Sequence, residues 1–166
     1  LLASHFWPGP LTLVLERHKD SPISLLASAG NDSVAVRVPD HKIARRLITL
    51  TGTPVVAPSA NPSGRISPSN AVHVKEGLGS ACDLILDGGP CRSGLESTVI
   101  DCRDNKVILL RPGPITAEQI KERTGLITAS SENNGTDGSI PLAAPGQLAS
   151  HYAPLARVRI NATTKQ

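Results

Sequence analysis

Residues 53–64 read TPVVAPSANPSG, and the prolines of this segment set the points where regular structure has to stop. Val55 and Val56 are β-branched, which predicts the end of a short strand. Pro58 and Pro62 then prevent the chain from continuing as a strand or a helix, because proline has no backbone N–H to donate. The segment therefore predicts a strand that ends in a rigid loop.

The loop at these two prolines carries Ser59 and Asn61, whose short side chains offer hydroxyl and amide donors. Donors that are held still need not reorient during a reaction, so the loop is a candidate ligand-binding site. The alternative is a proline-rich surface loop in which both side chains bond to their own backbone. Ser67 and Pro68 next predict the start of a helix that runs to about Glu76, and with it a crevice where the helix N-terminus favours an anion.

The segment SVAVRV, residues 33–38, alternates in a way that is typical of a strand. Its valines face one way, whereas Ala35 and Arg37 face the other. An arginine on such a face is costly to bury without an anion, so Arg37 is expected to point at solvent, a carboxylate or a phosphate. Asp40 then predicts the cap of a helix that ends at Gly52.

Short motifs predict the remaining elements. Arg111 ends a predicted strand and precedes Pro-Gly-Pro, so it is a second cation at a strand end. The alternative for each arginine is an ordinary surface charge. Little periodicity remains after Thr128, which predicts a linker. The other predicted elements are strands over 11–15, 82–86, 97–101 and 106–110, a turn at 104–105, and a capped helix from Thr116 to Thr124 with Gly125 after it.

The composition disfavours several classes of protein. With 166 residues and a net charge of +3, the chain has room for one domain and a tail, and leans only slightly towards polyanionic ligands. Aromatic residues are too few for a surface that stacks single-stranded bases. Three cysteines without a CxxC pair argue against disulfides or zinc and for a cytoplasmic protein. No segment is apolar enough to cross a membrane, and the absence of Met predicts a fragment whose beginning is missing.

The candidate site residues are cations and hydroxyl or amide groups, with no paired carboxylates and no Ser-His-Asp set. Such residues suit the holding of a polyanion and the stabilisation of charge on a transferring phosphoryl group. Nucleophilic catalysis by the protein and a protein-bound metal are not indicated. The set consists of Arg37, Ser59, Asn61, Ser67, Ser97, Thr98 and Arg111.

Six motifs in order resemble the YrdC-like domain of the threonylcarbamoyl-AMP synthase family, and they cover nearly the whole chain. They are WPGPLTLVL (7–15), VAVRVPDH (34–41), APSANPSG (57–64), STVID (97–101), LLRPG (109–113) and PGQLASHYAP (145–154). The last motif resembles the two-domain version of the family. The resemblance implies an α/β fold with an open, twisted mixed sheet flanked by helices, a basic concave face and an extended C-terminal linker. It divides the chain into a catalytic domain (1–127), a linker (128–155) and the start of a small C-terminal domain (156–166).

The resemblance also implies a nucleotidyltransferase that converts L-threonine, bicarbonate and ATP, with Mg²⁺ on the ATP, into threonylcarbamoyl-AMP and pyrophosphate. The product would pass to downstream threonylcarbamoyl-transferase machinery for the threonylcarbamoyladenosine modification of tRNA, with possible tRNA contact. Arg37 and Arg111 would be the catalytic residues. By position, the threonine-binding residues would be Arg37, Ala57 and Ser97, and the ATP-binding residues would be Ser33, Ser59, Asn61, Ser67, Arg111 and Tyr152 or its neighbour His151.

The Lys-x-Arg motif that the family carries near its N-terminus is absent, so we expect this fragment alone to bind ATP weakly and to turn over poorly. One alternative is a double-stranded RNA or tRNA binding module without catalysis, which would grip the nucleic acid by shape. Another is an accessory domain of the kind found in hydrogenase-maturation proteins. Salt dependence separates RNA binding from adenylate formation, because phosphate contacts weaken steeply with salt.

Overall fold

The computed structural model describes residues 1–130. Tyr152, His151, the proposed C-terminal domain and the predicted linker beyond Ser130 therefore lie outside the described residues. Within them the chain forms two compact units, one of Leu1–Ala57 with residues 92–130 and one of Pro58–Cys91. Each unit is described by itself.

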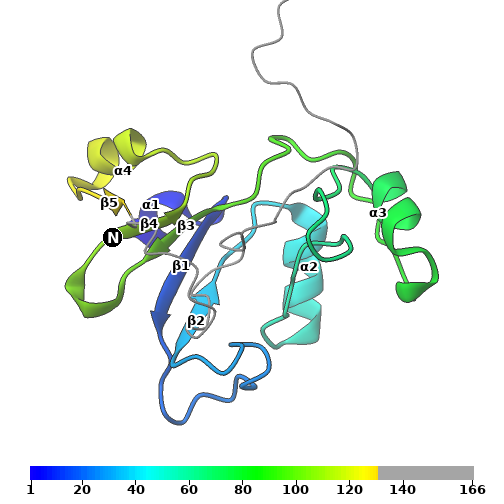
Figure 1. Cartoon of the computed structure of the whole chain (residues 1–166), viewed down its shortest axis with the longest axis horizontal. Coiled ribbons are helices and arrows are strands. Elements are labelled where there is room, and N and C mark those ends of the chain that lie inside the picture. The colour runs from blue at the N-terminus through cyan, green and yellow to red at the C-terminus, as the bar shows by residue number, and fades with distance from the viewer. Residues whose placement is uncertain (131–166) are drawn as a thin grey trace, which may run out of the picture. The chain divides into compact units, whose positions relative to one another are not determined.

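A five-stranded sheet forms the centre of the first unit (Figure 1), with the strand order β2-β1-β3-β4-β5. The pair β1–β2 and the pair β3–β4 are antiparallel, whereas β1–β3 and β4–β5 are parallel. The expected mixed, open α/β sheet is therefore confirmed. The strands are β1 (Leu11–Glu16), β2 (Ser33–Val36), β3 (Thr98–Asp101), β4 (Ile108–Arg111) and β5 (Ala129–Ser130).

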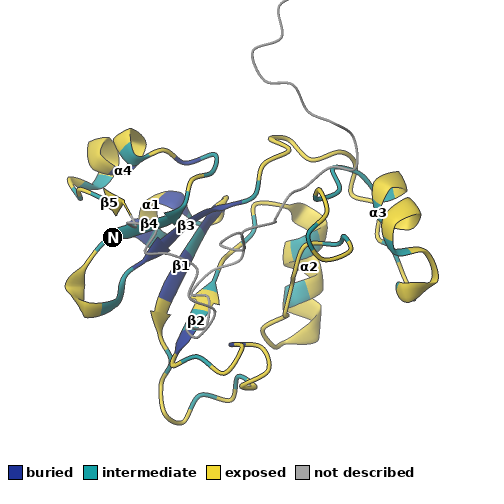
Figure 2. Cartoon of the chain, in the orientation of Figure 1, coloured by how far each residue is buried: buried dark blue, intermediate teal, exposed yellow. Residues whose placement is uncertain are grey.

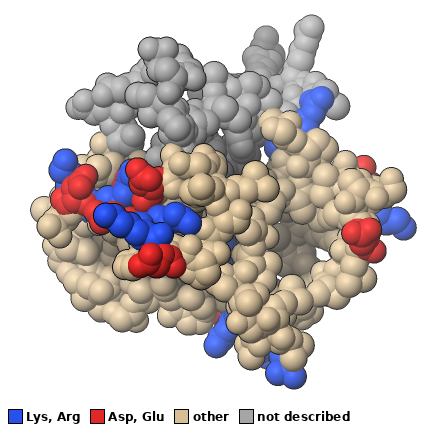
Figure 3. All heavy atoms as spheres, turned by 90° about the horizontal axis from the view of Figure 1, so that it is seen from below, with Lys and Arg blue, Asp and Glu red and all other residues tan. Residues whose placement is uncertain are grey.

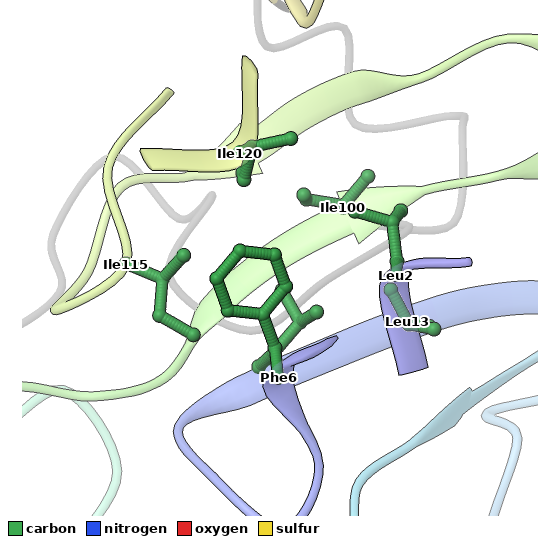
Figure 4. Packing of buried hydrophobic residues seen from close by; sticks show 7 residues of the cluster. Leu2, Phe6, Leu13, Ile100, Ile115 and Ile120 are labelled. Atoms are coloured by element: carbon green, nitrogen blue, oxygen red, sulfur yellow. The ribbon is translucent and has the colours of Figure 1, made fainter. Parts of the chain in front are cut away.

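One face of this sheet packs against two helices, α1 (Leu2–Phe6) and α4 (Ala117–Thr124). Figure 4 shows their apolar side chains meeting those of the strands. Burial of this apolar surface is the main term that stabilises the unit. Figure 2 shows the burial concentrated in β1 and β3. The buried cluster consists of Leu2, Phe6, Leu11, Leu13, Ile100, Ile115 and Ile120.

Local signals position α4 and the β3–β4 hairpin as predicted. Thr116 and Gln119 form both bonds of a capping box, and Gly125 ends the helix in the left-handed conformation. Asp104 and Asn105 have positive φ values and lie in η2 (Arg103–Asn105), which joins the two strands of the hairpin. Both residue types tolerate this backbone region, so the predicted turn is confirmed.

Helix α2 (Lys42–Thr51) begins one residue later than predicted, and its cap is His41 instead of Asp40. The ring nitrogen Nδ1 of His41 accepts the N–H of Ala44 at 3.5 Å. Asp40 is occupied elsewhere, because its carboxylate and its carbonyl both accept from Nη2 of Arg92, at 3.2 and 2.9 Å.

Two predicted strands are wrong. Val55 and Val56 have no regular structure, and neither has the segment 82–86. A strand needs a neighbouring backbone to take its hydrogen bonds, and these segments pair with no strand of residues 1–130. Most of their side chains are exposed, Leu84 by 76%.

In the second unit, helix α3 (Ala71–Leu78) is followed by the short η1 (Gly79–Ala81). The helix begins three residues beyond the predicted Pro68, because the side chain of Asn70 caps it by accepting the N–H of His73 at 2.9 Å.

None of the helices in the described part of the chain has the length and apolar character needed to span a bilayer.

Candidate functional site

The sheet face opposite α1 and α4 carries the polar candidates of the first unit. Val14 and Val99 are buried on this face, and alternation along β1 and β3 places Thr12 and Ser97 there as well. Arg111 joins them because it is the register partner of Val99. This face therefore has apolar side chains at its centre and polar side chains at one end.

Ser97 lies at the centre of this polar group and is 5% exposed. Arg111 donates from Nε and Nη2 to the Ser97 carbonyl, at 3.0 and 2.9 Å, and from Nη2 to the Ser97 Oγ at 3.1 Å. On its other side the Ser97 Oγ lies 2.7 Å from the Thr12 Oγ1. A chain of hydrogen bonds thus runs from Thr12 through Ser97 to Arg111.

Arg37 belongs to the same face. Ala35 of β2 is the register partner of Val14, and the alternation of β2 continues one residue beyond the strand, which places Arg37 on the side of Ala35. Desolvation lowers the pKa of Arg37, and the positive charge of Arg111 lowers it further. Part of the Arg37 surface is still exposed. Among the described residues, no hydrogen bond or ion pair to Arg37 is observed. Two guanidinium groups held close enough to repel each other suit an anionic ligand, which would relieve the repulsion.

The loop after Arg111 is fixed by two close contacts with the start of β3. Thr98 Oγ1 donates to the Ile115 carbonyl at 2.7 Å and accepts the Ile115 N–H at 3.0 Å. A Cβ atom on Gly113 would lie 2.6 Å from the Glu96 carbonyl oxygen and still closer to the Thr98 nitrogen. Only glycine allows this approach, which keeps Arg111 beside Ser97.

Thr98 itself corrects an expectation, because its side chain is not part of the polar face. It is fully buried on the opposite face and is bonded to Ile115. Ser33 is buried at the start of β2, opposite Glu16, on the same face as Ala35 and Arg37. Ala57 is exposed.

The second unit contains the proline-braced loop with Ser59, Asn61 and Ser67. Both donors of the Asn61 amide are used locally, on the carbonyls of Pro62 at 2.9 Å and Arg65 at 3.0 Å. The Asn61 Oδ1 accepts from Ser67 Oγ at 3.4 Å. Asn61 therefore braces the bend, as the alternative interpretation of this loop expects, whereas Ser59 is exposed.

Sequence reasoning missed Thr12. The available signal was the pattern LTLVLE in β1, in which a hydroxyl residue alternates with buried leucines and so faces away from the main core.

Among residues 1–130, no group of three or more His, Cys, Asp or Glu side chains is arranged to hold a metal ion.

Comparison with known proteins identifies the class to which this fold and its polar sheet face belong. The Sua5/YciO/YrdC family, which carries the description "Telomere recombination", matches residues 1–113. The chain belongs to this family.

Relatives agree with this assignment. The chain is 46% identical over 159 residues to the threonylcarbamoyl-AMP synthase of Pyrococcus abyssi and 44% identical over 159 residues to that of Bacillus subtilis. These alignments cover 95% and 96% of this chain but 46% and 45% of the relatives. A crystal structure of P. abyssi Sua5 in complex with L-threonine superposes with a TM-score of 0.82 and 44% identity, over 92% of this chain and 44% of that one. The chain thus spans about half the length of the relatives it matches.

Proposed function

We propose that this chain forms part of the active site of a threonylcarbamoyl-AMP synthase, a nucleotidyltransferase that acts on L-threonine, bicarbonate and ATP. The observation that carries the proposal is the pair of guanidinium groups on one sheet face, where desolvation and then the charge of Arg111 lower the pKa of Arg37. The relatives that bear this name, and the L-threonine held by P. abyssi Sua5, support the choice of substrates.

The chemistry explains why two fixed cations are needed. The threonine amine forms a C–N bond with bicarbonate and releases water, which gives a carbamate. A carbamate oxygen then bonds to the α-phosphorus of ATP, and the bond to the β-phosphate breaks with its electrons on the leaving pyrophosphate. Since both reactants are anions, the protein mainly positions them and offsets their repulsion. Magnesium arrives with the ATP as part of that substrate.

Within this proposal Arg37 holds the threonine carboxylate, with Ser97 and the Ala57 backbone beside it. The ATP contacts proposed from the sequence are Ser33, Ser59, Asn61, Ser67, Arg111 and, beyond the described residues, Tyr152. The product would pass to downstream threonylcarbamoyl-transferase machinery for tRNA modification. We also keep, as proposals, the catalytic domain over 1–127, the linker over 128–155 and the further domain from 156.

The test measures pyrophosphate release from ATP and bicarbonate with and without L-threonine. It also measures the binding of L-threonine and of ATP to the protein by calorimetry. We expect release that depends on threonine and is lost in Arg37→Ala and in Arg111→Ala. Arg123→Ala is the matched control, since Arg123 lies over the Phe6 ring on the other face of the sheet. If release is small, the binding measurement decides. A chain that binds neither ligand would contradict the proposal.

The alternative of a double-stranded RNA or tRNA binding module gains no support from the charges in view. In the densest charged group of Figure 3, acidic side chains lie beside the basic ones, so that group is not a continuous basic patch. An RNA binder would lose affinity with salt at a log–log slope of roughly −0.7 to −0.9 per phosphate contact.

A further inference from the structure

The proposed function uses the Ser97 hydroxyl but not the Thr12 hydroxyl that lies beside it. The two oxygens lie 2.7 Å apart, a short distance typical of an O–H···O bond, and either of them can donate. Thr12 is half-buried on the β1 strand, and Ser97 is buried. A 2.7 Å contact between strands that are far apart in sequence therefore links the two side chains across the sheet face.

Counting donors and acceptors shows what this pair can offer. The Ser97 oxygen already accepts from Arg111 at 3.1 Å, so one of its two lone pairs is occupied. The two hydroxyls hold two protons, and their mutual bond uses one of them. One hydroxyl proton therefore remains to be donated to a ligand, whichever oxygen donates within the pair. When Thr12 donates, both Ser97 lone pairs are filled and Ser97 can only donate.

From this geometry we propose that Thr12 is a positioning residue for Ser97. It occupies the second lone pair of the Ser97 oxygen and so directs the Ser97 proton towards an acceptor oxygen of the amino-acid substrate. The proposal rests on the proposed function, because it takes Ser97 to face threonine. It adds that Ser97 meets an anionic oxygen, such as a carboxylate or carbamate, and not the substrate ammonium group.

The test compares Thr12→Val, which keeps the side-chain shape and removes the hydroxyl, with Thr12→Ser, which keeps the hydroxyl. Thr49→Val is the matched control, because the Thr49 hydroxyl donates to the Arg45 carbonyl within helix α2. For each protein we would measure the affinities for L-threonine and for ATP by calorimetry, the KM and kcat of pyrophosphate release, and the melting temperature.

We expect Thr12→Val to weaken L-threonine binding by about two- to tenfold, the range of one hydrogen bond, with ATP affinity and kcat unchanged and the melting temperature lowered by only a few degrees. Thr12→Ser should restore the affinity, and Thr49→Val should behave as the parent. Unchanged threonine affinity in Thr12→Val overturns the proposal. An equal loss in Thr12→Ser also overturns it, since the methyl group and not the hydroxyl would then matter. A parent chain that binds no threonine overturns the proposed function as well, which distinguishes the two failures.

Discussion

Arg111 and Ser97 are joined by three hydrogen bonds, two from the guanidinium to the Ser97 carbonyl and one to the Ser97 hydroxyl. The residue proposed to hold ATP therefore contacts the residue proposed to hold threonine directly. Replacing the Arg111 side chain therefore removes contacts of Ser97 as well. Such a contact is a physical route by which the two substrates can influence each other's affinity, and any such influence is reciprocal.

Arg111→Lys should therefore weaken the binding of both substrates. A lysine ammonium keeps the charge but lacks the planar fork that bonds to the Ser97 carbonyl through two nitrogens. We expect the affinity for L-threonine to fall by about two- to tenfold and that for ATP by at least as much, as calorimetry would measure. Arg92→Lys is the matched control, since Arg92 bonds to Asp40 instead. A loss confined to ATP would show that the Ser97 contact has no consequence.

Gly113→Ala should destabilise the first unit. Its new methyl group would lie 2.6 Å from the Glu96 carbonyl oxygen and would collide with backbone, which cannot move aside as a flexible side chain can. We expect a loss of roughly 1–3 kcal/mol in the free energy of unfolding, which urea denaturation measures. Gly77→Ala is the control, because its nearest neighbour would be Pro62 at an ordinary 3.5 Å. Equal stability of the two variants would contradict the argument.

Local signals account for the parts of the fold that the sequence predicted well. The capping box at Thr116 and Gln119 and the turn at Asp104 and Asn105 depend only on neighbouring residues, and both occur as expected. The alternation around Arg37 likewise indicated the correct face, because side-chain direction in a strand follows from the backbone alone.

The remaining features depend on residues that are distant in sequence. Segment 82–86 is apolar enough for a strand, yet pairing requires a neighbour that its own residues cannot reveal. Thr98 and Ser97 are neighbours in a predicted strand, so alternation alone places their hydroxyls on opposite faces. The partner of Thr98 is Ile115, 17 residues away, and only the fold shows that the Thr98 face is the one packed against the main core. The pattern of β1 gives the face on which Thr12 lies but not its partner Ser97, which lies 85 residues away.

The ion pair between Asp101 and Arg103 should make stability depend on acid. The hydrogen bond from Arg103 holds the pKa of Asp101 below its ordinary value of 3.8. A lowered pKa in the folded state means that the stabilisation is present above pH 3.8 and is lost as the pH falls through the folded-state value. Asp101→Asn should thus cost about 1–2 kcal/mol at pH 7 and less at pH 2, by urea denaturation. Asp83→Asn, at an exposed position, is the control. A cost that is the same at both pH values would refute the role of the charge.

Cys102 should react more slowly with alkylating reagents than Cys91. Desolvation raises the pKa of the Cys102 thiol, and the negative charge of Asp101 raises it further, so less thiolate is present at a given pH. Cys91 is exposed. The rates are measured by mass spectrometry after timed iodoacetamide treatment from pH 7 to 10, and we expect the Cys102 rate to rise at higher pH than the Cys91 rate. This separates acidity from access, because poor access alone would lower the Cys102 rate at every pH. Asp101→Asn should move the Cys102 profile towards lower pH but only in part, since desolvation is the larger cause. A Cys102 profile that does not move in Asp101→Asn would mean that the neighbouring carboxylate does not act on the thiol.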